Sequence, residues 1–484
     1  METRTQPREQ SERQSSPCLC VDLDGTLVQT DTIIESLVGL FRSKPLRVFR
    51  LFLYVFLGKA RFKQELAREA ALQPDALPYA VPVLDYVRSE VARGRRVLLV
   101  TGADASVAHL VARHLGLFSD VICSDGHENV TGKAKLAAIR RVLGDEEFSY
   151  AGNSRADLHV WRGAKSAVIV SSSTALRKAV ERSGIQVEKV FPARRLSLFT
   201  IVKAMRAYQW TKNVLILLPI ALGHHLLERG TMIQGMRAFF AFSLCASATY
   251  LVNDILDLPT DRKHARKRHR PLPSGSLSVP AAAILIVLLL AGAVALNPGR
   301  EAGLLLVFYA ASTLAYSLYL KRLLMIDVIM LAVFYTVRVL YGGAATGITV
   351  SIWTLAFSMF MFLSLALIKR ISELQSGVSD QGLTGSGRAY QLNDLYQMSA
   401  LCAASGCIAA LVIILYVYSP EVMPLYSHPR LLLAIFPLLI YWQSRLLILA
   451  NRGVIHDDPI VFSLSDRASQ ATAIAVLLLA IAAQ

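Results

Sequence analysis

The sequence predicts a multi-domain fold class, in which an N-terminal α/β domain precedes an all-α polytopic membrane domain of about nine transmembrane helices. Two observations carry this prediction. Hydrophobic residues make up 54% of the 484 residues, yet the formal net charge is +16. A nucleic-acid-binding protein would explain the charge but not the apolar excess, so we expect no nucleic-acid partner. The second observation is that long apolar stretches are confined to the C-terminal part of the chain.

Three segments follow one another along the chain. Residues 1–16 are polar and charged and lack the apolar core of a signal peptide, so we expect a disordered tail. Residues 17–197 contain short apolar runs bounded by turn residues, which is typical of a soluble α/β domain. Residues 198–484 are dominated by long apolar stretches and predict the membrane domain.

We predict the membrane spans from their length, because a helix needs roughly 17–25 mostly apolar residues to cross a bilayer. They lie near residues 213–228, 237–256, 280–297, 302–320, 323–347, 351–369, 398–418, 430–450 and 470–484. Most Lys and Arg residues of the connecting loops follow the even-numbered spans. Because basic loops stay in the cytoplasm, we expect a multi-pass protein of the cell inner (plasma) membrane with a cytoplasmic N-terminal domain.

The N-terminal domain carries its strongest motif, V-D-L-D-G-T-L, at residues 21–27, directly after an apolar strand. Asp22 and Asp24 are separated by one residue, so the first can attack phosphorus while the next handles a proton. This motif resembles the DxDGT motif of the haloacid dehalogenase-like phosphatase superfamily. The resemblance implies a Rossmann-like α/β fold and makes Asp22 and Asp24 the candidate catalytic residues.

Two further segments resemble phosphate-binding motifs of that superfamily, in the expected order. The run V-L-L-V-T-G ends a strand with Thr101, the expected phosphate-binding hydroxyl. The run N-V-T-G-K-A-K offers Lys135, or alternatively Lys133, to neutralise the phosphate.

A magnesium site is implied by the last match, A-G-N-S-R-A-D at residues 151–157. Asp22, Asp157 and the Asp24 carbonyl would bind the cation. Asn153 stands where the superfamily usually has Asp, and its amide oxygen would be a ligand that brings no charge. The alternative is a domain that keeps the fold but has lost the activity.

The segment between the first two motifs, residues 30–90, is expected to form a helical cap. Its stretch Phe49–Phe56 is aromatic, is flanked by basic residues and is too short to span a membrane. Such a stretch suits either the membrane interface or a cap helix packed on its own core.

The membrane domain carries its main motif at the cytoplasmic end of the second span. Asn253, Asp254, Asp257 and Asp261 fall on one face of a helix, although Pro259 kinks or interrupts it. Acidic side chains beside a bilayer are costly unless they bind something, and carboxylates in this arrangement suit Mg²⁺ bridging a diphosphate. A basic run follows that can bind further phosphate, and it includes Arg266 and Lys267.

This pattern resembles the first aspartate-rich motif of the UbiA superfamily of membrane prenyltransferases. Residues 206–213, R-A-Y-Q-W-T-K-N, resemble a signature of its decaprenyl-phosphate phosphoribosyltransferase-like branch. The run Y-S-L-Y-L-K at residues 316–321 resembles the same branch. The resemblance implies substrate-binding roles for Lys212, Arg266, Lys267, Tyr316, Lys321, Lys369, Arg370 and Arg388.

The implied reaction moves 5-phosphoribose from phosphoribosyl diphosphate to a polyprenyl phosphate, with Mg²⁺ as cofactor. Asp254 and Asp257 would be catalytic, and the fused phosphatase would remove the 5-phosphate. One alternative is a UbiA-type aromatic prenyltransferase that uses a polyprenyl diphosphate donor. Another is a phosphatase domain that is degenerate and serves regulation or membrane docking.

Overall fold

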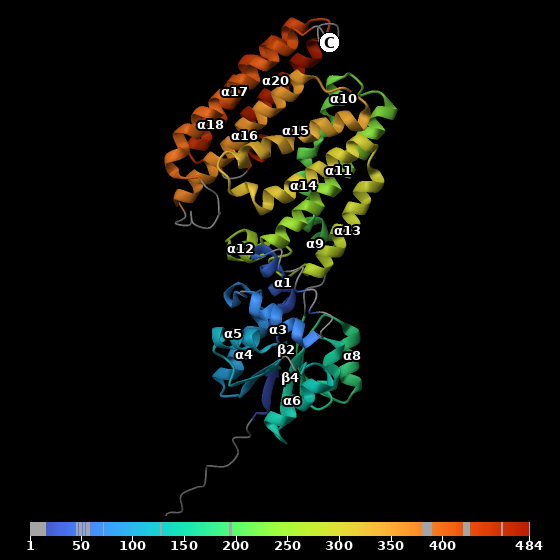
Figure 1. Cartoon of the computed structure of the whole chain (residues 1–484), viewed down its shortest axis with the longest axis vertical. Helices are drawn as coiled ribbons and strands as arrows, with labels where there is room; N and C mark the ends of the chain where they lie inside the picture. The colour runs from blue at the N-terminus through green and yellow to red at the C-terminus, as the bar shows by residue number, and fades with distance from the viewer. Residues whose placement is uncertain are drawn as a thin grey trace, which may run out of the picture. The chain divides into compact units, whose positions relative to one another are not determined.

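The computed structural model describes residues 16–44, 47, 51, 54, 59–70, 72–125, 128–192, 196–379, 390–419, 426–455 and 458–483. The expected disordered tail and most of the stretch Phe49–Phe56 lie outside these residues. The chain divides into two compact units, drawn together in Figure 1. The first contains Met1–Ala204 and Asp254–Ala282, and the second contains Met205–Asn253 and Ala283–Gln484.

The first unit is built around a parallel six-stranded sheet of order β3-β2-β1-β4-β5-β6. Its strands are β1 (Cys18–Val21), β2 (Val97–Asp104), β3 (Asp120–Ser124), β4 (Phe148–Gly152), β5 (Ser166–Val170) and β6 (Gln186–Phe191). The strand order reverses direction at β1, between β2 and β4, and ligands of such sheets bind beside the carboxyl ends of the strands at this point. The predicted α/β domain is therefore confirmed.

Helices cover both faces of this sheet. In β1, Leu19 and Val21 point to one face and Cys18 and Cys20 to the other, as a strand requires. The first face packs against α4 (Val81–Ala92) and α5 (Ala105–Leu115). The second face packs against α6 (Lys133–Leu143), α7 (Leu158–Trp161) and α8 (Thr174–Arg182). The core thus forms two apolar layers that fix the sheet between them.

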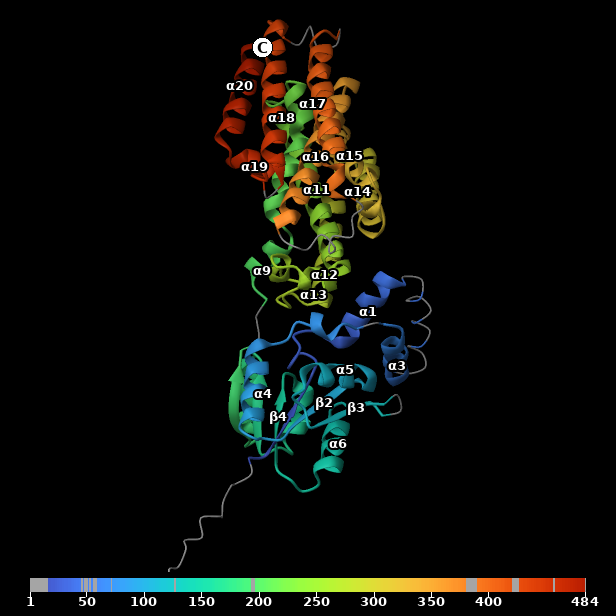
Figure 2. The same ribbon diagram turned by 90° about the vertical axis from the view of Figure 1, so that its left-hand side faces the viewer.

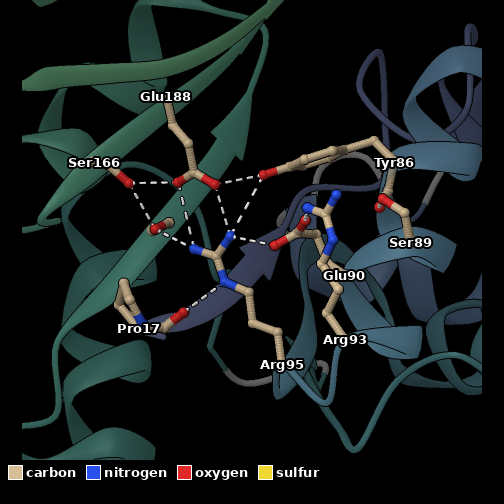
Figure 3. Close-up of polar contacts among 9 residues, drawn as sticks. Pro17, Tyr86, Ser89, Glu90, Arg93, Arg95, Ser166 and Glu188 are labelled. Carbon is tan, nitrogen blue, oxygen red and sulfur yellow. Dashed lines mark hydrogen bonds and ion pairs between the residues drawn. The ribbon is translucent and has the colours of Figure 1, made fainter. Parts of the chain in front are cut away.

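A buried arginine ties the amino ends of these strands together (Figure 3). The Arg95 guanidinium lies 2.7 Å from Glu188 and 2.8 Å from Glu90, and it donates to Ser149 at 2.5 Å. Its Nε donates to the Pro17 carbonyl at 2.7 Å. This network joins β4, β6, α4 and the residue before β1, at the end of the sheet where the strands begin.

The expected cap contains α1 (Thr32–Ser43), α3 (Lys59–Glu69) and the short helix η2 (Pro74–Ala76). Leu40, Leu51, Leu66 and Ala70 form its buried cluster. The first unit also includes α9 (Leu198–Ala204), α12 (Leu258–Lys263) and η5 (Lys267–His269). Residues 254–261, which contain the three aspartates of the main membrane motif and are called the acid-rich segment below, are therefore part of this unit.

The second unit is an all-helical bundle (Figure 2). It contains α11 (Arg229–Leu256), which ends in the first unit, and most of α13 (Val279–Leu296). The other long helices are α14 (Arg300–Leu318), α15 (Ile326–Thr346), α16 (Ile352–Ser379), α17 (Leu395–Val417), α18 (Ile435–Asn451) and α20 (Arg467–Ala483). Among the described residues, seven helices are long and apolar enough to cross a membrane, or eight with the bent pair α19 (Pro459–Ser465) and α20. The predicted membrane domain is confirmed, and the expected count of about nine was approximate.

The stretch 213–228 shows why the count differs. It folds as the end of the 3-10 helix η4 (Ala207–Leu217), the short helix α10 (Leu218–Leu222) and a turn. Pro219 lies in the first turn of the new helix, and His224 takes a positive φ of 62° beyond Gly223. A rule that counts apolar residues does not register these helix-breaking positions.

Candidate functional site

Three predicted phosphatase residues meet at the carboxyl ends of β1 and β4. Asp22 follows β1, Lys135 lies in the first turn of α6, and Asp157 ends the short helix η3 (Arg155–Asp157). Lys135 Nζ lies 2.8 Å from Asp22 Oδ1 and 3.9 Å from Asp157 Oδ1, and all three side chains are buried. Tyr150, which the sequence analysis missed, accepts from Lys135 at 2.9 Å and donates to Asp157 at 3.0 Å.

The two carboxyls of the first motif differ in their surroundings. Burial raises the pKa of the Asp22 carboxyl to about 6, and the charge of Lys135 opposes this shift. Burial, together with the nearby Asp31, raises the pKa of Asp24 to about 7. The backbone N–H of Thr32, at the start of α1, donates to Asp24 Oδ1 at 2.8 Å. A carboxyl that titrates near neutral pH can donate a proton to a leaving group, which suits Asp24.

Thr101 lies near the carboxyl end of β2, where its buried hydroxyl accepts from Ala103 N at 3.0 Å. From the cap helix α3, Lys63 donates to the carbonyl of the next residue, Gly102, at 2.7 Å. The phosphate-binding role of Thr101 stays a prediction. Lys63 is a cap residue that the sequence analysis did not select, because no motif marks it.

The acidic loop holds Asp157 firmly in place. Asp157 Oδ2 accepts from Asn153 N at 3.1 Å, from Ser154 N at 2.9 Å and from Ser154 Oγ at 2.8 Å. The Asn153 side chain reaches the first motif, since a Cβ at Gly25 would lie 2.0 Å from Asn153 Nδ2. Gly25 also has φ +72°, so this position favours glycine twice over.

The donor atoms around Asp22 suit a hard cation. Asp22, the Asp24 carbonyl, Asn153 and Asp157 offer oxygen donors alone, which Mg²⁺ prefers. In the described part of the chain, no group of three or more His, Cys, Asp or Glu side chains is arranged to hold a metal ion. The donor chemistry fits Mg²⁺ with few protein ligands, and the metal assignment stays a prediction.

The acid-rich segment forms a bend instead of one continuous helix. Helix α11 ends at Leu256, and the Asp257 carbonyl accepts from Thr260 N at 3.0 Å and from Asp261 N at 2.8 Å as α12 begins. Pro259 lies in the first turn of α12, where a missing N–H costs nothing. The predicted interruption is therefore real, and it separates Asp254 from Asp261 by a change of helix.

The basic run folds back onto these acids. Arg270 Nη1 lies 2.7 Å from Asp261 and 3.3 Å from Asp254, and both carboxylates are buried. Lys267 Nζ lies 3.6 Å from Asp261, and Arg266 is exposed. The segment therefore contains its own counter-charges, which a bound diphosphate with its cation would rearrange.

Asn253 is the one residue among the four polar residues of this motif that belongs to the second unit. Its Oδ1 is buried and has no hydrogen-bond partner among the described residues. A buried amide oxygen without a partner is costly, and a cation would satisfy it. Asn253 thus fits the ligand role that the resemblance gives it.

Two predicted lysines meet in the second unit. Lys212 of η4 and Lys369 of α16 lie 2.7 Å and 3.4 Å from the same oxygen, Asp458 Oδ2. The other Asp458 oxygen accepts from Ile460 N at 3.1 Å and caps α19. Asp458 therefore caps the helix and pairs with both lysines at the same time.

A second pair of predicted residues meets around a buried acid. Arg370 Nε lies 2.6 Å from Asp327, and Arg370 Nη2 donates to the Tyr316 hydroxyl at 3.3 Å. Tyr390 donates to the other Asp327 oxygen. Asp327 is fully buried and Arg370 nearly so, which fixes the geometry of both.

For the two remaining predicted residues, Lys321 and Arg388, the structure adds little to the prediction. Lys321 lies on the short helix η6 (Leu320–Arg322), and Arg388 lies outside the described residues.

Asn213, the last residue of the Q-W-T-K-N run, is held by Arg338, which donates to Asn213 Oδ1 at 2.8 Å. Arg338 is buried among the rings of Phe242, Tyr309 and Tyr335.

Known proteins and protein families are similar to both the N-terminal and the C-terminal part of this chain. The family model described as haloacid dehalogenase-like hydrolase matches residues 19–162, and that of the UbiA prenyltransferase family matches residues 216–453. Protein y4nM of Sinorhizobium fredii is 35% identical over 458 residues, which are 94% of this chain and 88% of that protein. Nodulation protein NoeC of Azorhizobium caulinodans is 30% identical over 282 residues, 57% of this chain and 91% of that protein. Decaprenyl-phosphate phosphoribosyltransferase of Mycobacterium tuberculosis is 40% identical over 187 residues, 36% of this chain and 60% of that protein.

Proposed function

We propose that this chain, an integral membrane protein that belongs to the UbiA prenyltransferase family and carries a haloacid dehalogenase-like hydrolase domain, transfers 5-phosphoribose from phosphoribosyl diphosphate to a polyprenyl phosphate. The observation that carries the proposal is the 40% identity to decaprenyl-phosphate phosphoribosyltransferase. It is supported by the Q-W-T-K-N run, whose Lys212 and Asn213 have defined buried partners.

The transfer breaks the bond between ribose C1 and the diphosphate oxygen and forms a bond from C1 to a phosphate oxygen of the lipid. Diphosphate leaves with the electron pair. Asn253, Asp254, Asp257 and Asp261 would hold Mg²⁺, which both families generally use and which neutralises the leaving diphosphate when bound. Carboxylates also stabilise the positive charge that develops on the ribose ring. The acceptor is already an anion, so no strong general base is needed.

The donor's 5-phosphate and the lipid phosphate need cations of their own. Lys212 and Lys369 share one carboxylate, so an incoming phosphate can replace Asp458 as their partner. Arg370 is held by Asp327, and its terminal nitrogens pair with Glu373 and Tyr316, partners that a bound phosphate would replace. The remaining cations proposed for phosphate binding are Arg266, Lys267, Lys321 and Arg388.

The phosphatase domain would remove the 5-phosphate of the transferred ribose. Asp22 attacks phosphorus, Asp24 gives its proton to the departing ribose oxygen, and Lys135 and Thr101 hold the phosphate. Water then releases inorganic phosphate from Asp22. The geometry of Asp22, Lys135 and Asp157 supports this step. We place the domain in the cytoplasm at the inner membrane because the basic loops favour that side.

The test supplies labelled phosphoribosyl diphosphate and a polyprenyl phosphate to the full chain in detergent with Mg²⁺. Lipid-linked label is expected, and the Asp22→Asn variant should accumulate the 5-phosphorylated product. Prenylation of an aromatic acid from a polyprenyl diphosphate, without lipid-linked label, would reverse the assignment. A wild-type product that keeps its 5-phosphate would overturn the phosphatase role alone.

A further inference from the structure

Arg262, the residue after Asp261, forms a forked ion pair with Glu35 of α1. Both nitrogen–oxygen distances are 2.7 Å, and the two side chains are only 7% and 5% exposed. A bidentate arginine–carboxylate pair fixes both orientation and distance, and burial removes the water that would loosen it. The pair therefore constrains the acid-rich segment more tightly than a surface ion pair would.

The rest of the Arg262 guanidinium is also bound. Its Nε donates to the Pro273 carbonyl at 3.1 Å, and Nη1 donates to the Ala76 carbonyl at 3.3 Å. One side chain thus joins α1, η2 and the far end of the segment 254–282. No variant of similar size reproduces this set of contacts, because only arginine offers the planar fork.

Further contacts surround this pair. Arg42 of α1 donates to Thr260 Oγ1 at 2.7 Å, and Lys263 lies 3.0 Å from Asp75. Gly275 lies against Gln29, where a Cβ would come within 2.7 Å of the Gln29 amide oxygen. These contacts are more exposed than the Arg262 pair. They enlarge the contact surface around that pair but constrain the acid-rich segment less than the pair does.

Helix α1 also contacts the phosphatase motif. Thr32 N, at its first turn, donates to Asp24 Oδ1 at 2.8 Å, and Glu35 follows one turn later. The connection to the acid-rich segment is equally short. Arg262 adjoins Asp261, whose backbone N–H donates to the Asp257 carbonyl at 2.8 Å.

We propose that Glu35 and Arg262 are positioning residues for the transferase reaction, in which the cap of the phosphatase domain holds Asp257 and Asp261 in the geometry that binds a magnesium diphosphate. The proposal rests on the diphosphate role given to the acid-rich segment under the proposed function. Groups that orient metal ligands without touching the metal set the affinity of the site, and their loss typically weakens it about 10- to 100-fold. The fusion of the two domains then has a structural purpose besides consecutive chemistry.

The experiment measures two quantities on the full chain in detergent. One is the Mg²⁺-dependent affinity for inorganic diphosphate, and the other is the separate KM and kcat for phosphoribosyl diphosphate. The variants are Glu35→Gln, Arg262→Lys and the exchanged pair Glu35→Arg with Arg262→Glu. The control is Glu128→Gln. It breaks an exposed ion pair in which one nitrogen, Arg141 Nη2, lies 2.7 and 2.8 Å from the two Glu128 oxygens, and the side chains of Glu128 and Arg141 are 44% and 62% exposed.

The single variants should weaken diphosphate binding about tenfold and raise KM in proportion, with a smaller change in kcat. The exchanged pair should recover part of the affinity. Glu128→Gln should bind diphosphate as the wild type does. A melting temperature and the hydrolysis of a generic phosphomonoester report whether each variant is folded.

Two results would overturn the proposal. In the first, a folded Glu35→Gln or Arg262→Lys variant binds diphosphate as tightly as the wild type. In the second, the wild type itself binds no magnesium diphosphate. A wild type that binds diphosphate but transfers no phosphoribose contradicts the proposed function alone, and the positioning role is then decided by the binding data.

Discussion

Lys135 Nζ lies 2.8 Å from Asp22 Oδ1, although 113 residues separate the two in the sequence. The lysine extends from the first turn of α6 and is buried together with its partner. Under the proposed function Asp22 attacks phosphorus, and a buried lysine beside it lowers the repulsion that an incoming phosphate would meet. We therefore expect a mutation in this pair to affect both hydrolysis and stability.

Replacing Lys135 by Met should abolish most phosphomonoester hydrolysis, by about 10²-fold or more, because the variant loses the cation that faces the phosphate. It should also destabilise the domain by about 3–5 kcal/mol, since Asp22 becomes a buried charge without its partner. Hydrolysis of a generic phosphomonoester and thermal unfolding measure the two effects. Lys165→Met is the control, because Lys165 pairs with Glu147 on the surface. Undiminished hydrolysis would contradict the role of Lys135.

Replacing Asp254 or Asp257 by Ala should abolish transfer of phosphoribose while the chain remains inserted in the membrane. The reason is that each variant removes a proposed ligand of the cation that neutralises diphosphate. Transfer of label to lipid measures the first property, and resistance to extraction from membranes measures the second. Glu301→Gln, in the exposed first turn of α14, is the control for loss of an acid. A variant that still turns over would refute the ligand assignment.

Asp458 combines two roles that two substitutions can separate. Asp458→Ser keeps a side-chain oxygen that can cap α19, and Asp458→Ala removes it, so Ala should cost about 1 kcal/mol more stability. Both leave Lys212 and Lys369 without their shared carboxylate. We expect both variants to change the KM for phosphoribosyl diphosphate equally, while only Ala lowers the melting temperature further. If the KM values followed the melting temperatures, the lysine pair would have no separate role.

That Asp22, Lys135 and Asp157 lie close together was predictable, because parallel strands end at one edge of a sheet. Asp22 and Thr101 belong to such ends, and Lys135 and Asp157 follow their strands at the spacing that the motifs require. Most long helices of the bundle were predictable from apolar length, but the stretch 213–228 was not, because length does not register the break near Pro219. These features are local in sequence, so one pattern contains all the information they need.

The partners of these residues were not predictable in the same way. Tyr150 stands in a buried strand, where an aromatic residue indicates core packing and gives no sign of its polar contact with Lys135. Glu35 and Arg262 are 227 residues apart, and no motif includes Glu35. Such pairs depend on how the chain folds back on itself, which a single sequence does not display.

The Arg95 network gives the first unit a pH dependence that Glu188→Gln should remove (Figure 3). Hydrogen bonds from Arg95, Tyr86 and Ser166 lower the pKa of Glu188 to about 2, although burial opposes them, from an ordinary value of 4.5. Because the folded-state pKa is depressed, this stabilisation is complete above about pH 4.5 and is lost as the pH falls towards 2. At neutral pH the variant should therefore be less stable by about 2 kcal/mol, the usual worth of a hydrogen bond to a charged group. The midpoint of heat inactivation of the phosphatase, assayed at neutral pH after incubation at each pH, measures the difference. It should shrink between pH 4.5 and 3, whereas the exposed pair of Glu181 with Arg177 predicts almost no effect of Glu181→Gln at any pH. A difference that stayed constant down to pH 3 would show that Glu188 stabilises the sheet by packing and not through its charge.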